Sequence, residues 1–421
     1  FFPSVSAAWR ISEENFWQPL KGWWNDMKIR GSYGSLGNQV MDDLGNFPYL
    51  ATYGTNSSYN YLINGSKPVI VKAPGLVAPD FTWETVTQMD FGFDASFLNN
   101  RLTGTFDWYR RNTKDMLVAG ATLPATLGAS VPKSNSADMK TIGWELSLGW
   151  NDRLENGFSY WVKGVLSDYQ ATITKYAGND AGFYSQSDGD GKYYVGQKIG
   201  EIWGYHSNGL FQSDDEAATI DQSELYAGKW GAGDVKYEDL DNDGKITKGE
   251  ETIYNPGDKS IIGNKTPRYQ FGITVGFDYK NFDFEMFWQG TGKRDYMLSG
   301  AQFWGFTSQW DVPYTPALDY WTETNTDAYF PRPGWQNGGN RVTSDRYLQS
   351  AAYGRLKNLT VGYTIPKNLT TKWGISRLRL YVTGENLLTI TPLNDAFDPE
   401  TLGGMTYPIN RKVAIGLNLT L

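Results

Sequence analysis

QMDFGFDASFLNNRLTGTFDW, residues 88–108, carries the pattern that repeats along the whole chain. Apolar residues occupy every second position from Met89 to Phe97, and Asp, Gly and Ser fill the positions between them. After Asn99-Asn100-Arg101 the alternation resumes from Leu102 to Trp108. Successive side chains of a strand point to opposite faces, so two such runs joined by an Asn-rich turn predict a β-hairpin.

The same two-residue period recurs throughout the sequence and predicts an all-β protein. Each predicted strand has one apolar, aromatic-rich face and one face of Gly, Thr, Ser, Asp, Glu and Gln. We expect about eleven strands, near residues 4–11, 27–36, 83–97, 102–118, 137–151, 158–176, 267–280, 282–293, 346–364, 377–390 and 410–421.

The length and composition of these strands favour a transmembrane antiparallel β-barrel. A soluble sandwich turns its polar face to water and usually carries Lys and Glu there. Here the strands are long and aromatic residues cluster near their ends, as in barrel strands with aromatic girdles and a polar lumen. In the first hairpin the side chains expected to face lipid are Met89, Phe91, Phe93, Phe97, Phe106 and Trp108.

The connections between the predicted strands alternate in length. Short turns (98–101, 152–157, 280–281) alternate with long segments (38–82, 119–136, 177–266, 294–345, 391–409). Bacterial barrels have short periplasmic turns, long extracellular loops and even strand numbers. We therefore expect residues 1–421 to form the C-terminal part of a 22-stranded barrel, with 177–266 as a long extracellular loop.

Composition excludes several classes of function. The 38 basic and 46 acidic residues give a net charge of −8, which argues against nucleic-acid binding. The sequence has no cysteine, hence no disulfide and no thiolate zinc site. His206 is the single histidine and has no evident catalytic partner nearby in the sequence, so we expect that the protein is not an enzyme.

Seven segments, in order along the chain, resemble one family. They are FPSVSAAWRISEE (2–14), MKIRGSYGSLGNQ (27–39), NGLFQSDDE (208–216), GDVKYEDLDNDGKIT (233–247), DYWTETNTDAYFPRP (319–333), YGRLKNLTVGYTIP (353–366) and LYVTGENLLTIT (380–391). The chain resembles the C-terminal half of the SusC-like TonB-dependent transporters of Bacteroidetes outer membranes. The family's plug and TonB-binding segment have no counterpart in these residues, so we expect them to precede Phe1.

The resemblance implies a multi-pass protein of the outer membrane, in contact with its lipids, that imports a nutrient with energy from TonB. It also implies a SusD-like surface lipoprotein as partner and an oligosaccharide or a peptide as substrate. Two alternatives stay open from the residues. One is a passive porin, and the other is a soluble or surface calcium-dependent β-protein that binds or cleaves carbohydrate.

Residues 239–250 match the calcium-loop pattern D-x-[DN]-x-[DN]-G-x₅-E at every defined position. Alternate carboxylates can converge on one cation, because the glycine at the sixth position permits a sharp turn. We expect calcium to be held by the carboxylates of Asp239, Asp241, Asp243 and Glu250, the carbonyl of Lys245, and Thr247 directly or through water. The alternative is a solvated acidic turn without an ion.

The long connections are rich in aromatic residues. Flat apolar rings stack on sugars and also anchor protein partners. We expect Trp304, Trp310 and Trp335 to be candidates for substrate contact. The alternative is that these rings pack the loops together or lie at the membrane interface.

Overall fold

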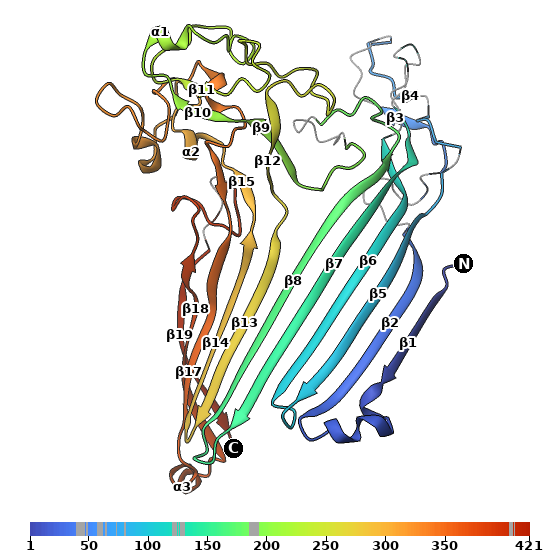
Figure 1. Cartoon of the computed structure of the whole chain (residues 1–421), viewed down its shortest axis with the longest axis vertical. Coiled ribbons are helices and arrows are strands. Elements are labelled where there is room, and N and C mark those ends of the chain that lie inside the picture. The colour runs from blue at the N-terminus through green and yellow to red at the C-terminus, as the bar shows by residue number, and fades with distance from the viewer. Residues whose placement is uncertain are drawn as a thin grey trace.

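The computed structural model describes residues 1–38, 47, 49–56, 62, 63, 65–72, 74–79, 81–119, 124, 126, 131–184, 193–403, 407 and 409–421. Its main element is one eleven-stranded antiparallel sheet (Figure 1). The strands, in order across the sheet, are β1 (Ser4–Arg10), β2 (Trp24–Asn38), β5 (Glu84–Phe97), β6 (Leu102–Ala119), β7 (Lys133–Arg153), β8 (Ser159–Tyr176), β13 (Arg268–Tyr279), β14 (Phe282–Lys293), β17 (Tyr353–Thr364), β18 (Arg377–Ile390) and β19 (Lys412–Thr420).

The eleven predicted strands are confirmed, with differences at their ends. β2 begins at Trp24 and β7 at Lys133, earlier than predicted. The predicted strand 346–364 is divided into β16 (Leu348–Ser350), which pairs outside the large sheet, and β17. The division falls at Ala351, which is fully buried and donates its N–H to the carbonyl of Arg294 instead of to a sheet neighbour.

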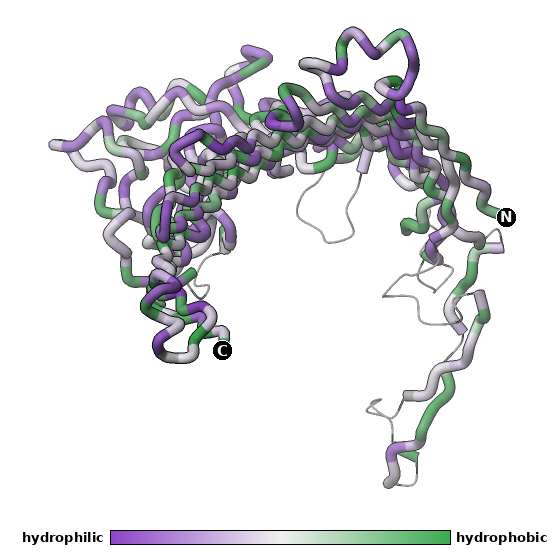
Figure 2. The backbone as a smooth tube through the Cα atoms, turned by 90° about the horizontal axis from the view of Figure 1, so that it is seen from below, coloured by the Kyte–Doolittle hydropathy of each residue, from purple (hydrophilic) through white to green (hydrophobic). Residues whose placement is uncertain are grey.

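The sheet curves into an open arc when it is viewed along its strands (Figure 2). β1 and β19 form its two edges, and each pairs on one side only. An arc of this kind is the expected shape of part of a barrel, because a complete barrel has no edges.

One face of the arc carries ion pairs that cross several strands. Arg30 on β2 contacts Asp94 on β5 and Asp107 on β6, and its Nη2 lies 2.7 Å from Asp107 Oδ2. Gly92 lies between them, where a Cβ atom would come within 2.3 Å of Asp107 and 2.9 Å of Arg30. Glycine at this position leaves room for the pair, because a side chain there would displace the ends of Asp107 and Arg30.

The opposite face of the arc is apolar. The rings of Phe93 and Phe106 lie 5.6 Å apart across β5 and β6, and those of Phe277 and Phe284 lie 5.0 Å apart across β13 and β14. Of the residues expected to face lipid, Met89 and Phe91 are exposed, and Phe93, Phe97, Phe106 and Trp108 are half-buried. Lipid contact by this face stays a prediction.

Connections at one end of the sheet are short, and those at the other end carry small elements. At the short end, η1 (Ile11–Glu13) and η2 (Asn15–Leu20) join β1 to β2, and α3 (Lys367–Thr370) and η6 (Thr371–Trp373) join β17 to β18. At the long end lie β3 (Gly54–Asn56), β4 (Ile70–Lys72), β9 (Glu201–Tyr205), β10 (Ser207–Leu210), α1 (Asp214–Ala217), β11 (Val235–Tyr237), β12 (Lys259–Asn264), β15 (Asp295–Met297), α2 (Ala301–Trp304), η4 (Thr315–Leu318) and η5 (Gly338–Arg341). In the part of the chain described, no helix has the length and apolar character needed to cross a membrane.

Three long connections pack into one unit, which we call the head: the described residues of 177–267, 294–352 and 391–403. They share a single cluster of buried side chains: Tyr205, Leu210, Val235, Tyr237, Ile246, Leu298, Phe303, Trp304, Phe330, Tyr347, Ala351, Leu393, Phe397 and Leu402. Residues 185–192 lie outside the described part of the first connection. The connections thus build a cored layer above the sheet (Figure 1).

The two faces of the β5–β6 hairpin should differ in their tolerance of charge. Phe93→Arg places a guanidinium on the apolar face and should destabilise a membrane-inserted barrel by about 2–4 kcal/mol if that position lies near the bilayer midplane. Ser96 on the polar face is buried and bonds to Asn100, so the comparison is Thr103→Arg, at the exposed position opposite Ser96, which should cost much less. Unfolding from bilayers by denaturant measures both, and equal costs would contradict this assignment of the faces.

Candidate functional site

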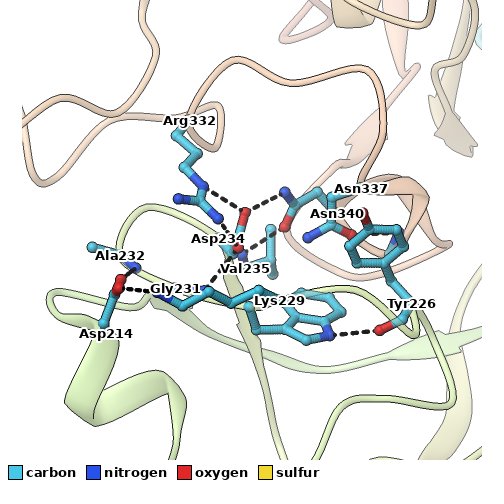
Figure 3. Close-up of polar contacts among 12 residues, drawn as sticks. Asp214, Tyr226, Lys229, Gly231, Ala232, Asp234, Val235, Arg332, Asn337 and Asn340 are labelled. Atoms are coloured by element: carbon cyan, nitrogen blue, oxygen red, sulfur yellow. Dashed lines mark hydrogen bonds and ion pairs between the residues drawn. The ribbon is translucent and has the colours of Figure 1, made fainter.

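Asp234 joins two of the connections that build the head (Figure 3). Its carboxylate is almost fully buried and lies 2.7 Å from Nη2 of Arg332. It also accepts hydrogen bonds from the Gly231 amide at 3.0 Å and from Asn340 Nδ2 at 2.8 Å. Asn340 Oδ1 in turn accepts the N–H of Val235 at 2.8 Å. A buried carboxylate is tolerated only when it is paired in this way.

Removal of this carboxylate should loosen the head. Asp234→Ala leaves the Gly231 amide and Asn340 Nδ2 without an acceptor and should lower the free energy of local opening by about 2–3 kcal/mol, because Arg332 is partly exposed and can be solvated. The exchange rate of the Val235 amide hydrogen measures that opening. Lys229→Ala is the matched control, because Lys229 pairs with Asp214 on the exposed side of the same connection. Its removal should cost no more than about 1 kcal/mol, and equal effects would contradict the assigned role of Asp234.

The predicted calcium loop has the expected turn but a different set of neighbouring carboxylates. Gly244 adopts a left-handed φ of 84°, and Asp239 accepts the N–H groups of Asp243 at 3.2 Å and Gly244 at 2.8 Å. The group of carboxylates that the structure brings together is Asp239, Asp241 and Asp258. Asp243 and Glu250 are both exposed and lie outside this group.

The spacing of this group permits a shared calcium ion. One oxygen from each of the three carboxylates lies within 4.8 Å of the others. Two oxygens that bind one calcium at about 2.4 Å can be at most about 4.8 Å apart, so a shared ion is possible. Desolvation and the carboxylates of Asp243 and Asp258 raise the pKa of Asp241, although the Asp243 amide donates to it. Lys245 and Thr247 lie within the same turn, and Thr247 donates its N–H to Asp258 Oδ2 at 2.7 Å.

Asp258 follows the twelve-residue pattern and therefore escaped the sequence prediction. It reaches the loop because the chain returns on itself, with Gly249 and Gly257 in close contact. A Cβ atom on either glycine would lie 2.5 Å from the backbone nitrogen of the other. Asp258 is buried and accepts the N–H of Leu240 at 2.8 Å. Ile246 packs into the core of the head and anchors the loop from within.

A cavity of about 570 Å³ lies beside this loop and is lined by Lys248 of the loop and by Glu251, which directly follows it. The rings of Tyr184 and Trp203 form part of the wall and stack at a centroid distance of 4.1 Å. Tyr205 also lines the cavity, and its buried hydroxyl has no hydrogen-bond partner among the described residues. Burial and the nearby Glu224 carboxylate raise the pKa of Tyr205, which keeps the phenol protonated. The cavity thus offers aromatic surface together with charged groups.

The single histidine also joins two connections. His206 Nδ1 lies 2.8 Å from Asp345 Oδ2, and its Nε2 lies 2.7 Å from Ser260 Oγ. These three groups are arranged in the order of a Ser–His–carboxylate triad. However, Ser260 and Asp345 also form contacts that hold the connections together. Ser260 lies within the paired strand β12, and Asp345 accepts the N–H of Ser207 at 3.0 Å. We assign the three residues to the joint between the connections.

The three tryptophans predicted to contact substrate occupy different environments. Trp304 is 8% exposed and packs in the head core, 4.5 Å from the ring of Tyr347. Trp310 and Trp335 are 82% and 46% exposed. Burial favours a packing role for Trp304, whereas the other two are accessible to a ligand or a partner protein.

Similarity to known proteins extends along the chain. The family described as TonB dependent receptor-like, beta-barrel matches residues 1–387. The chain belongs to this family. TonB-dependent receptor P3 of Formosa agariphila is 30% identical over 459 aligned residues, which cover 100% of this chain and 42% of the relative. TonB-dependent receptor SusC of Bacteroides thetaiotaomicron is 27% identical over 99% of this chain and 40% of its own length.

A solved structure titled "Structure of the RagAB peptide transporter" shares the fold. It superposes with a TM-score of 0.77 at 22% sequence identity, over 99% of this chain and 43% of that chain. The chain therefore spans less than half the length of these relatives. The SusC-like resemblance and the barrel fold predicted from the sequence are confirmed by these matches.

Proposed function

We propose that this chain is part of an outer-membrane importer that takes up an oligosaccharide or a peptide with energy from TonB. The observation that carries the proposal is the family match over residues 1–387, together with a sheet that forms an open arc. The coupling to TonB would be made by segments outside these residues. No bond of the substrate is made or broken in this proposal. The polar face of the arc would line the lumen, and the apolar face would contact lipid.

The open question of substrate class can be decided with the whole protein. The name of the RagAB relative refers to a peptide, whereas the exposed Trp310 and Trp335 would also suit sugar rings. Uptake of labelled oligosaccharides and peptides by cells that carry or lack the gene, with and without TonB, tests the proposal. Uptake that does not depend on TonB would favour a passive porin. Recovery of the protein in the soluble fraction would favour the calcium-dependent carbohydrate-binding alternative.

We propose that the head contacts a SusD-like surface lipoprotein. Trp310 and Val312 are 82% and 76% exposed, and both lie in the connection 294–352. Large apolar side chains with this exposure often mark an interface with another protein.

Charge on this surface should weaken the complex. Trp310→Glu combined with Val312→Glu should reduce co-purification of the lipoprotein with the full-length transporter at least tenfold, because two carboxylates would lose their hydration in the interface. The exposed Lys229→Glu substitution on another connection is the control and should leave the complex intact. Undiminished recovery with the double variant would exclude this surface.

We propose that calcium binds Asp239, Asp241 and Asp258 and holds the loop that walls the cavity. Calcium supplies positive charge that relieves the repulsion among the three carboxylates. Asp243, Lys245, Thr247 and Glu250 stay predicted ligands from the sequence pattern. The role is structural, because the loop contributes Ile246 to the core of the head and Lys248 to the cavity.

Loss of one clustered carboxylate should weaken calcium binding. Asp241→Asn should lower the affinity at least tenfold by calorimetry and raise protease sensitivity within residues 230–260. Glu250→Gln distinguishes the two ligand sets, since it should have little effect if Asp258 completes the site. A wild-type protein that binds no calcium at millimolar concentration would refute the site.

A further inference from the structure

Four cations gather on the apolar face of the sheet, at the loop end of β6, β7 and β8. Arg110 pairs with Ile142 and lies two residues beyond Trp108 on the same face. Lys140 pairs with Asn112, and Lys175 pairs with Asp138 one row further. Lys114 pairs with Thr85 on β5. We call Arg110, Lys114, Lys140 and Lys175 the cationic band.

The orientation of the band follows from residues that neighbour it in the chain. Met139, next to Lys140, packs against the buried cluster of Ala137, Ile173 and Tyr176 on the other face. Arg111, next to Arg110, donates to Gln88 at 3.2 Å on that same polar face. Since successive strand residues point to opposite faces, Arg110 and Lys140 face outward with the apolar side chains.

The band lies at the height of a membrane interface. Eight residue steps separate Arg110 from Leu102 beside the short turn, which is about 27 Å along the strand at about 3.4 Å per residue. A strand tilt of about 40° reduces this to about 20 Å along the barrel axis, close to the roughly 25 Å height of the apolar band of such barrels. Lys140 lies one row further out. The aliphatic stems can therefore lie along apolar surface while the charged ends reach the headgroups.

The charges of the band are only partly balanced by the protein, because Asp138 lies opposite Lys175. Among the described residues Arg110, Lys114 and Lys140 form no ion pair with a carboxylate, and Arg110 donates to Asn112 at 3.3 Å. Asp115 follows Lys114 in the chain, and Asp138 and Asp168 lie on β7 and β8. Asp138 accepts the N–H of Asp115, and Asp168 is paired with Arg268. Arg110 and Lys140 are diagonal neighbours on adjacent strands, so their like charges repel unless an anion lies between them.

We propose that the cationic band binds the phosphate groups of a lipid A-type glycolipid in the outer leaflet. The proposal rests on the outer-membrane location proposed above. The band continues directly from an exposed apolar surface, with Met89 44% and Ile142 39% exposed in the row of Arg110. A partner must therefore offer acyl chains and anionic groups side by side, and a phosphorylated lipid does so. The loop end of the sheet faces the outer leaflet, where the phosphate-bearing lipid is a glycolipid.

Native mass spectrometry of the full-length protein in detergent, with added lipid A, tests this proposal. We expect retention of lipid A by the wild-type protein and weak retention of the same lipid after removal of its phosphates. Arg110→Gln combined with Lys140→Gln should weaken binding about 30-fold, from a contribution of about fivefold per cation near an anionic surface. Phosphatidylglycerol should compete poorly.

The matched control is Arg111→Gln combined with Lys163→Gln. This control removes the same charge from the polar face, where Lys163 pairs with Thr274 and Gly149. It should leave the binding of lipid A unchanged. Equal binding of dephosphorylated lipid A, or an equal loss in the control, would overturn the proposal. Equal binding of phosphatidylglycerol would overturn the choice of glycolipid. The comparison of the two lipid A forms on the wild-type protein decides the question even if the double variant does not fold. Absence of the protein from outer-membrane fractions would instead refute the proposed location.

Discussion

The two-residue period of the strands, held in register across the sheet, is the constraint on which the structure depends. Interior strands form hydrogen bonds on both sides, so their side chains can point only to one face or the other. Arg30 reaches Asp107 across β5 only because β2, β5 and β6 keep the same alternation. A one-residue slip of β2 would move Arg30 to the apolar face. The same slip in β5 would move Phe91 and Phe93 to the polar face. The strand register therefore determines which side chains lie on the polar face and which lie on the apolar face.

Because this constraint is local, the strands and their faces could be read from the sequence. Alternation predicted the hairpin of β5 and β6, and the Asn-rich turn between them is present. The strand ends depend on contacts that alternation does not encode. Ala351 interrupts the predicted strand 346–364 because it is buried in the head and bonds to Arg294. Such contacts join residues far apart in the chain and leave no periodic signal.

The head shows the limit of local patterns more clearly. The calcium-loop pattern identified Asp239 and Asp241, which lie together, but Asp258 joins them only through the close approach of Gly249 and Gly257. Likewise, a count of aromatic residues marked Trp304, Trp310 and Trp335 alike, although Trp304 lies in the core. Whether a ring packs or contacts a ligand is set by the folding of three connections against one another.

A shared core makes these connections energetically dependent on one another. Ile246 of the predicted calcium loop, Phe330 of the second connection and Phe397 of the third belong to one buried cluster. Asp234 adds an ion pair between the first two, and its buried carboxylate would lose its partners if they separated. An interaction that orders one connection therefore stabilises the surfaces on the others. A partner bound at Trp310 and an ion held at Asp241 would act on the same folded unit, although they touch different segments of the chain.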